Sequence, residues 1–277
     1  MNALQIVRLM NREDRKVATA VGRALPAVAR AVNAIVKAIR SGGRLIYVGA
    51  GSSGRMAVLD AAECPATFGT SPKLVQALMA GGRAAVTGAV EGAEDSLANA
   101  DRDLRAINLT RNDVVVGICA SGTTPYVLAA LRFARKRGAE TVAITVNRNT
   151  PMAGLAKILI VTGVGPEVLT GSTRLKAGTS QKMVLNMLTT AAMARLGHVY
   201  ENLMIDVKAS NRKVSERMVR ILAEAGGQSR SASEHALRQS GHNLRVALVM
   251  LKLHVSASDA KMRLRNRKGH LREALGE

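Results

Sequence analysis

The run LIYVGAGSSG, residues 45–54, is the stretch that decides the fold. Four apolar residues lead into a turn of glycine and serine, and a helical composition follows from Arg55 to Glu63. We expect this helix to end before Pro65, because proline disrupts a helix interior. A short run that is apolar throughout is typical of a strand buried on both faces of a parallel sheet. The stretch therefore predicts one strand–turn–helix unit of an α/β fold.

Four more apolar runs predict the remaining strands of the same sheet. They lie at Leu74–Met79, Val114–Ile118, Thr141–Val146 and Ile158–Val161. Helices are predicted over residues 84–106, 125–136 and 172–196. Strands that alternate with helices predict a doubly wound, parallel five-stranded sheet, in which ligands bind beyond the carboxyl ends of the strands.

Helical segments flank this sheet on both sides in the sequence. Residues 2–40 carry apolar side chains mostly at three- and four-residue spacing, and Pro26 predicts a kink or a break. Three short helical patterns predict a small C-terminal bundle, over residues 213–225, 231–238 and 243–253. The expected organisation is an N-terminal helical segment, a central α/β domain and a C-terminal helical bundle, over residues 1–43, 44–208 and 209–277.

Composition excludes several classes of protein. The chain has two cysteines and five histidines, and no pair of them has the spacing of a metal site, so we expect no metal. No apolar run reaches the roughly 18 residues that cross a bilayer, so no membrane role is expected. The polar, charged start of the chain lacks the apolar segment of a signal peptide, which predicts a cytoplasmic protein.

The formal net charge of +20 lies mainly in the flanking segments. It is +7 over residues 1–44, +4 over residues 45–206 and +9 over residues 207–277. A basic surface attracts polyanions. With two Phe, three Tyr and no Trp, however, the chain has few aromatic side chains for stacking on bases. We therefore expect no specific nucleic-acid binding, and a surface that helps to attract an anionic substrate.

The turn after the first strand formally fits the G-x-G-x-x-G pattern of dinucleotide-binding proteins. That pattern also requires an acidic residue about 20 positions further on, at the end of the second strand. Residues 73–79, KLVQALM, contain none. The same geometry suits a single phosphate, because glycines let the backbone approach an anion and the N–H groups of a helix start bind it.

A second polar loop, ASGTTP at residues 120–125, follows the third strand and also opens a helix. Two such loops after neighbouring strands predict one phosphate site with hydroxyl ligands. The candidates for phosphate contact are Ser52, Ser53, Ser121, Thr123 and Thr124. The alternative is that Ser53 and Thr124 are ordinary helix N-caps.

A third loop, TGSTRLK at residues 170–176, also opens a predicted helix. Its Ser172 and Lys176 are further candidates for substrate binding, because the lysine ammonium could reach an anion. In the alternative, Ser172 caps the helix and Lys176 is simply solvated. The sequence does not separate these two interpretations.

Several longer motifs resemble one family. They lie at residues 45–55, 59–65 (LDAAECP), 89–95 (AVEGAED), 165–172 (GPEVLTGS), 176–179 (KAGT) and 202–208 (NLMIDVK). Together they resemble the N-acetylmuramic acid 6-phosphate etherases, a family with the sugar isomerase (SIS) fold, over nearly the whole chain. The resemblance implies a homodimeric lyase of bacterial cell-wall recycling, without metal or organic cofactor, that removes D-lactate from a phosphorylated amino sugar.

The two catalytic glutamates of that family match Glu63 and Glu94. By this resemblance Glu63 protonates the departing lactate and Glu94 handles the proton on C2 of the sugar. Two carboxyl groups in different environments can supply such an acid and base. Composition alone does not single out Glu94, because Glu91 and Asp95 lie beside it. Glu167 is a further carboxylate beside a loop, either a substrate contact or a residue that orders the loop.

The chain departs from the family pattern at two places. Thr123 stands where the family usually has Arg, and a segment that precedes the first helix in the family is lacking. Three other functions therefore remain open. They are a non-catalytic sugar-phosphate sensor of the SIS fold, an aldose–ketose phosphate isomerase, and nucleic-acid binding through the basic flanks.

Overall fold

The computed structural model describes residues 1–207 and 212–277, and its chain forms two compact units. The first unit contains residues 1–63 and 71–192, and the second contains residues 64–70 and 193–277. The predicted domain boundary between residues 208 and 209 lies outside the described residues. The three-part division drawn from the sequence therefore stays a prediction.

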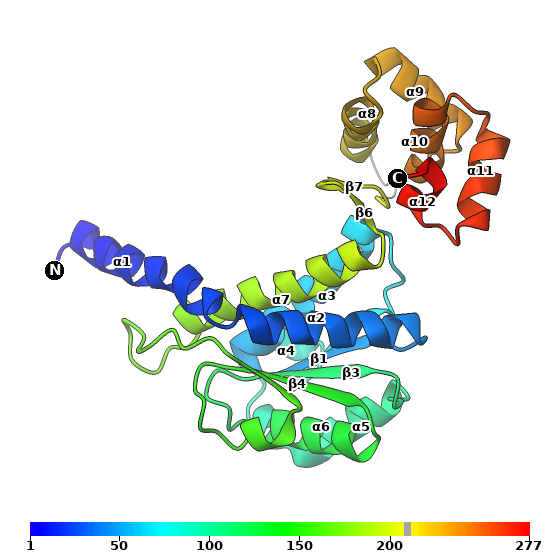
Figure 1. Ribbon diagram of the computed structural model, residues 1–277. Coiled ribbons are helices and arrows are strands. Elements are labelled where there is room, and N and C mark those ends of the chain that lie inside the picture. The colour runs from blue at the N-terminus through cyan, green and yellow to red at the C-terminus, as the bar shows by residue number, and fades with distance from the viewer. Residues whose placement is uncertain (208–211) are drawn as a thin grey trace. The chain divides into compact units, whose positions relative to one another are not determined.

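A parallel sheet of five strands forms the centre of the first unit, in the order β2-β1-β3-β4-β5 (Figure 1). Its strands are β1 (Leu45–Gly49), β2 (Val75–Met79), β3 (Val114–Ile118), β4 (Glu140–Thr145) and β5 (Ile158–Val161). Every residue of β1 and β3 is buried, as the continuous apolar runs predicted. All five predicted strands are confirmed to within one residue. The strand order reverses between β1 and β3, which is where such sheets bind ligands.

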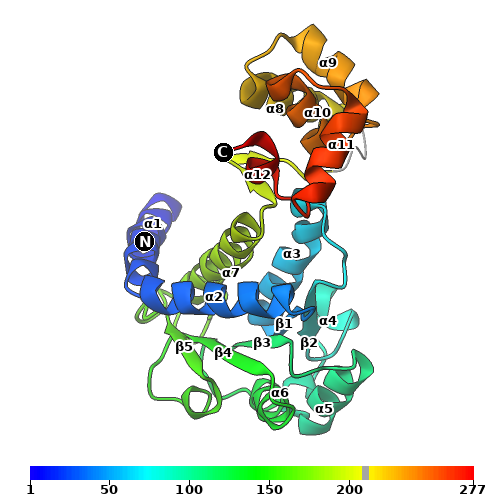
Figure 2. The ribbon, with the colours of Figure 1, turned by 45° about the vertical axis from the view of Figure 1, so that its right-hand side comes forward.

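Helices cover both faces of this sheet (Figures 1 and 2). On one face lie α2 (Leu25–Arg40), α3 (Gly51–Phe68) and α7 (Lys176–Arg195), and on the other lie α5 (Leu97–Ala106) and α6 (Pro125–Lys136). The shorter or flanking elements are α1 (Ala3–Gly22), α4 (Ala84–Thr87), η1 (Ala93–Asp95) and η2 (Ala153–Leu155). The break predicted at Pro26 is confirmed, because α1 ends at Gly22 and Pro26 lies in the first turn of α2.

The prediction that the helix after β1 ends before Pro65 is wrong. Helix α3 continues to Phe68 with Pro65 in its interior. Cys64 and Phe68, on either side of the proline, are 2% and 5% exposed. Burial of these two side chains offsets the hydrogen bond that Pro65 cannot donate.

The helix predicted over residues 84–106 is divided in the structure. Gly88 is extended, with φ −135° and ψ −178°, and Gly92 is left-handed, with φ 66°. These two glycines separate α4 from the short 3₁₀ turn η1 and from α5. The division matters for function because it places Glu94 in η1, outside any long helix.

The second unit is a small helical bundle with a β-hairpin. The hairpin pairs β6 (Val199–Tyr200) with β7 (Leu203–Met204). The helices are α8 (Arg212–Gly226), α9 (Arg230–Gln239), α10 (Leu244–Leu253), α11 (Ala257–Asn266) and α12 (Leu271–Leu275). The first three confirm the predicted bundle to within one residue, whereas the hairpin, α11 and α12 were not predicted. In the part of the chain described, every helix is too short or too polar to cross a bilayer.

Candidate active site

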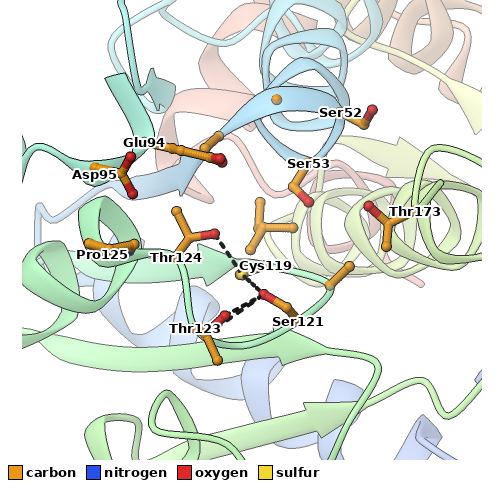
Figure 3. Close-up of a pocket in the computed structure, with 14 residues that line it drawn as sticks. Ser52, Ser53, Glu94, Asp95, Cys119, Ser121, Thr123, Thr124, Pro125 and Thr173 are labelled. Atoms are coloured by element: carbon orange, nitrogen blue, oxygen red, sulfur yellow. Dashed lines mark hydrogen bonds between the residues drawn. The ribbon is translucent and has the colours of Figure 1, made fainter. Parts of the chain in front are cut away.

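A cavity of about 360 Å³ lies beyond the carboxyl ends of β1 and β3 (Figure 3). Its lining includes hydroxyl groups from both polar loops and two carboxylates; the polar side chains are Ser52, Ser53, Glu94, Asp95, Ser121, Thr123, Thr124 and Thr173. Among the described residues that line it, none is Lys or Arg. Backbone N–H groups and hydroxyls are therefore the anion donors of this cavity in a single chain.

The first loop contributes the start of α3. Gly51, Ser52 and Ser53 all line the cavity and form the first turn of the helix. The first four N–H groups of a helix have no partner within the helix, and the helix dipole places partial positive charge there. Ser53 is 9% exposed, so its hydroxyl lies at the floor of the cavity and not on an open surface.

The second loop is held by its own hydrogen bonds (Figure 3). The Ser121 and Thr123 hydroxyls are 2.8 Å apart, and the Thr123 N–H donates to Ser121 Oγ at 3.3 Å. The Cys119 thiol donates to Thr124 Oγ1 at 3.2 Å. Pro125 then opens α6 directly behind this loop, so a second helix start faces the cavity. The two predicted loops thus meet at one place.

Glu94 lies at the opposite side of the cavity from the second loop's Thr123 (Figure 3). It also lines a neighbouring cavity of about 270 Å³, together with Arg55 and Asp95. The Arg55 guanidinium donates to the carbonyl oxygens of Ala85, Val86 and Gly88 at 2.7–2.9 Å. Arg55 therefore ties α3 to the segment that leads into the turn carrying Glu94.

Glu63, the second predicted catalytic glutamate, does not line the cavity. It is exposed on α3, ten residues after Ser53, which is about 15 Å along the helix axis at about 1.5 Å per residue. Within one chain the structure brings Glu94 to the polar loops and leaves Glu63 away from them. The role of each glutamate stays a prediction.

A buried carboxylate fixes α3 in place between these two ends. The Asp60 side chain accepts hydrogen bonds from Tyr47 at 2.9 Å, Asn186 at 2.8 Å and Thr189 at 3.1 Å. Burial raises the pKa of the Asp60 carboxyl above its ordinary value, against the lowering effect of these three donors. The network joins α3 to β1 and α7, and it sits one helical turn before Glu63.

The third loop does not supply the expected cation to the cavity. Lys176 is buried, and its Nζ donates to Glu13 Oε2 on α1 at 2.8 Å. The solvated alternative for Lys176 is therefore wrong, whereas its role in substrate binding stays a prediction. Ser172 also lies outside the cavity lining. Glu167 orders the loop, because its carboxylate accepts from the Lys176 and Ala177 N–H groups at 3.0 and 2.9 Å and so caps α7.

Among the lining residues, three with hydrogen-bonding or reactive side chains were not predicted from the sequence: Asp95, Cys119 and Thr173. Cys119 directly follows β3, so the rule that ligands lie beyond strand ends could have identified it. Asp95 and Thr173 lie next to predicted site residues in the sequence, Glu94 and Ser172. Only the orientation of their side chains in the fold brings them into the cavity, and the sequence does not show this. In the described residues no group of three or more His, Cys, Asp or Glu side chains is arranged to hold a metal ion.

Comparison with protein-family models and with solved structures assigns the fold. Residues 27–135 match the glucokinase regulatory protein N-terminal SIS domain, and residues 93–191 match the SIS domain. The phosphoheptose isomerase GmhA from Neisseria gonorrhoeae aligns with 70% of this chain and 100% of its own, with a TM-score of 0.55 and 17% identity. The Vibrio vulnificus NanR protein, complexed with ManNAc-6P, covers 69% of this chain and 64% of its own, at a TM-score of 0.50 and 16% identity. Proteins with different names thus share this fold, so the fold alone does not assign an activity.

Comparison with curated sequences is more specific. The N-acetylmuramic acid 6-phosphate etherase of Serratia proteamaculans (strain 568) is 52% identical over 275 residues, which are 99% of this chain and 93% of the relative. The protein of the same name from Yersinia pestis (strain Pestoides F) is 53% identical over the same shares of both chains. The SIS fold and this near-complete similarity agree with the cavity described above. The chain belongs to the N-acetylmuramic acid 6-phosphate etherase family.

Proposed function

We propose that this chain is a lyase that cleaves the D-lactyl ether of N-acetylmuramic acid 6-phosphate. Its products are N-acetylglucosamine 6-phosphate and D-lactate. The observation that carries the proposal is the etherase relatives' identity of 52–53% over 99% of the chain. A cavity with hydroxyl loops on one side and a carboxylate on the other provides the chemistry that such a substrate requires.

The phosphate of the substrate is placed between the two polar loops. The α3 and α6 helix starts supply backbone N–H groups and partial positive charge. Ser52, Ser53, Ser121, Thr123 and Thr124 supply hydroxyls. Ser172 and Lys176 were also predicted to bind substrate; neither lines the cavity of one chain, and their role stays a prediction. Thr123, in place of the family's Arg, leaves the loop without a cation, so hydrogen bonds dominate phosphate recognition.

The reaction proceeds by elimination and then hydration. In the open-chain sugar the C1 aldehyde makes the C2 proton acidic. Glu94 removes that proton, a C2–C3 double bond forms, and the C3–O bond breaks as Glu63 protonates the departing lactate oxygen. Water then adds its hydroxyl to C3 and a proton to C2. A positioned general acid or base typically contributes about 10²–10⁴-fold to such a step.

The distance between Glu63 and the cavity supports a homodimer, in which the site is shared between two copies of the chain. An exposed carboxylate about 15 Å along α3 from Ser53 cannot protonate a group held beside Glu94 in the same chain. It can do so when a second copy supplies it, and a two-fold interface would then complete two sites at once. The family resemblance implies the homodimer and a reaction in cell-wall sugar recycling. The cytoplasmic location is a separate expectation from the sequence.

The test is D-lactate release from N-acetylmuramic acid 6-phosphate by the purified protein. We expect Glu94→Gln and Glu63→Gln each to lower kcat by about 10²–10⁴-fold with the fold retained. Glu91→Gln is the matched control for Glu94, since it removes an exposed carboxylate three residues away and should keep activity near the wild-type level. Near-normal release by Glu94→Gln would remove this residue from the mechanism.

Mixing the two inactive variants tests the shared site. After subunit exchange, about half of the dimers contain one chain of each kind, and each of these has one intact site, so about a quarter of wild-type activity should return. If both glutamates act within one chain, mixing restores nothing. Saturable binding of the phosphosugar without any lactate release in the wild-type protein would instead support the sensor, and turnover of a hexose phosphate lacking the ether would support an isomerase.

A further inference from the structure

The Cys119 thiol lies at the base of the cavity, where β3 ends and the second polar loop begins (Figure 3). The residue is 5% exposed, yet it contributes to the cavity lining. The mechanism proposed above gives it no role. Its contacts, however, are with the residues that are expected to bind phosphate.

Three hydrogen bonds surround the Cys119 sulfur. The Gly122 N–H donates to Sγ at 3.2 Å, and the thiol donates to Thr124 Oγ1 at 3.2 Å. The Ser121 hydroxyl lies 3.3 Å from Sγ. Burial alone would raise the pKa of the Cys119 thiol, but hydrogen bonds to the sulfur from the Ser121 hydroxyl and from the Thr124 and Gly122 N–H groups outweigh it, so the pKa lies below its ordinary value.

These contacts determine which hydrogen atoms remain for a ligand. A hydroxyl has one hydrogen to donate and two lone pairs. Because Thr124 Oγ1 accepts from the thiol, its own hydrogen stays available to point into the cavity. The bond from Gly122 N–H to Sγ also holds the backbone turn that carries Ser121 and Thr123.

We propose that Cys119 is a positioning residue for the phosphate of the substrate: its thiol holds the second loop and directs the Thr124 hydroxyl toward the phosphate oxygens. The inference rests on the proposed function, because it takes the phosphate site from it. Cys119 itself does not touch the reacting atoms, so its effect falls on binding of the phosphosugar and not on the elimination.

The first test compares two substitutions at this position. We expect Cys119→Ala to raise KM about tenfold while kcat changes less than about twofold, since phosphate contacts act equally in the ground and transition states. Cys119→Ser should restore KM to within about threefold of wild type, because a hydroxyl can make the same donor and acceptor contacts. An unchanged KM in Cys119→Ala, or an equal loss in both variants, overturns the proposal.

A buried control separates positioning from general destabilisation. Val116, in the middle of β3, is fully buried and has an apolar side chain. Val116→Ala should lower the Tm at least as much as Cys119→Ala but leave KM within about twofold of wild type, because it removes packing and no hydrogen bond. If Val116→Ala raises KM as much as Cys119→Ala, the effect is structural and the proposal fails.

Conversion of the thiol to a methyl disulfide provides a readout that does not depend on lactate release. Methyl methanethiosulfonate should modify Cys119 more slowly when inorganic phosphate is present, whereas Cys64, the chain's other cysteine, should react at an unchanged rate. Protection of Cys119 in a protein that releases no lactate would refute the etherase proposal and leave this inference standing. Equal rates with and without phosphate would place the phosphate elsewhere.

Discussion

The two polar loops of the cavity look alike in sequence and differ in how they are built. Both follow a central strand, both contain glycine and hydroxyl residues, and both open a helix. In the loop after β1, Ser52 and Ser53 belong to the first turn of α3. In the loop after β3, side chains bond to one another, and Figure 3 shows its dashed hydrogen bonds only among Cys119, Ser121, Thr123 and Thr124.

This difference indicates two ways of preparing a site for an anion. The loop after β1 relies on a rigid helix, whose first N–H groups are available to an anion without help from side chains. The loop after β3 has no helix backbone until Pro125, so its hydroxyls are ordered before a ligand arrives by their own contacts. Preorganised donors lose less entropy on binding. A substitution in the second loop should therefore disturb its neighbours, and one in the first loop should not.

The largest expected difference is between two glycine substitutions. Gly122, with φ +76°, would place a Cβ 2.6 Å from the Thr150 side chain, whereas at Gly51, with φ +51°, a Cβ would meet nothing within 4 Å. Both changes strain a left-handed residue by about 1–2 kcal/mol. Gly122→Ala adds overpacking of about 1–3 kcal/mol. Urea unfolding should therefore show Gly122→Ala to be less stable than Gly51→Ala by about 1–3 kcal/mol.

The same two variants, Gly122→Ala and Gly51→Ala, should also differ in their KM for the phosphosugar. Gly122 donates its N–H to Cys119, so displacing it disturbs the whole second loop, and KM for the phosphosugar should rise at least tenfold. Equal unfolding free energies for the two alanine variants would mean that the second loop adapts as easily as the first. The two loops would then not differ in how much a substitution within them lowers the free energy of unfolding.

Serine-to-alanine substitutions in the two loops should show the same difference between the loops, with a smaller effect on KM and on stability. Ser53→Ala removes one hydroxyl from a helix turn, and the loss of one hydrogen bond to phosphate should raise KM by about tenfold or less. Ser121→Ala also removes contacts with Thr123 and Cys119, so it should raise KM further and lower unfolding free energy by about 0.5–1.5 kcal/mol. For both variants, steady-state kinetics of lactate release gives KM, and urea unfolding gives the free energy of unfolding.

Ser258→Ala, an exposed hydroxyl in the second unit, serves as the control and should leave KM unchanged. If Ser121→Ala changes KM no more than Ser53→Ala does, the hydrogen bonds within the second loop do not contribute to binding.

Much of the first unit could be predicted because its signals are local. Each buried strand is a continuous apolar run, and α6 begins and ends where Pro125 and Gly138 indicate. The convergence of the two polar loops follows from strand order alone, since parallel strands that are neighbours end at the same edge. Local patterns therefore located the hydroxyls of the site.

The remaining errors have non-local causes. Lys176 reads as a free cation in the sequence, but its partner Glu13 is 163 residues away. Pro65 reads as a helix end, but tertiary burial of Cys64 and Phe68 continues the helix. Helix α11 buries only Ala260 and Leu264, so its apolar periodicity is weak, although Ser256 accepting from the Asp259 N–H is a capping signal that was present. Glu63 is a different case: its role stays a prediction, because the proposed partner of its site lies in another chain.

The smallest expected effect on catalysis comes from the third loop, because its Lys176 is paired with Glu13 of α1. Hydrogen bonds from Lys16 and Lys176 lower the pKa of Glu13 from 4.5 to about 2. A carboxyl with a depressed pKa in the folded state stabilises the fold fully above its unfolded pKa, and this stabilisation is lost as the pH falls from about 4.5 toward 2. Glu13→Gln should remove that part of the acid dependence and leave the buried Lys176 ammonium without its carboxylate.

Thermal melts from pH 7 to pH 2 test this prediction. The Tm of Glu13→Gln should be lower than that of wild type at pH 7, and its decrease below pH 4.5 should be shallower. Lys16→Ala, which removes only the exposed partner of Glu13, should change the Tm less, because the pair with buried Lys176 remains. KM should stay within about twofold of wild type in both variants, since neither side chain lines the cavity. A large rise in KM for Glu13→Gln would show that the Lys176–Glu13 pair does support binding of the phosphosugar, and the contrast between two loops whose polar groups bind the substrate and a third loop whose cation does not would be lost.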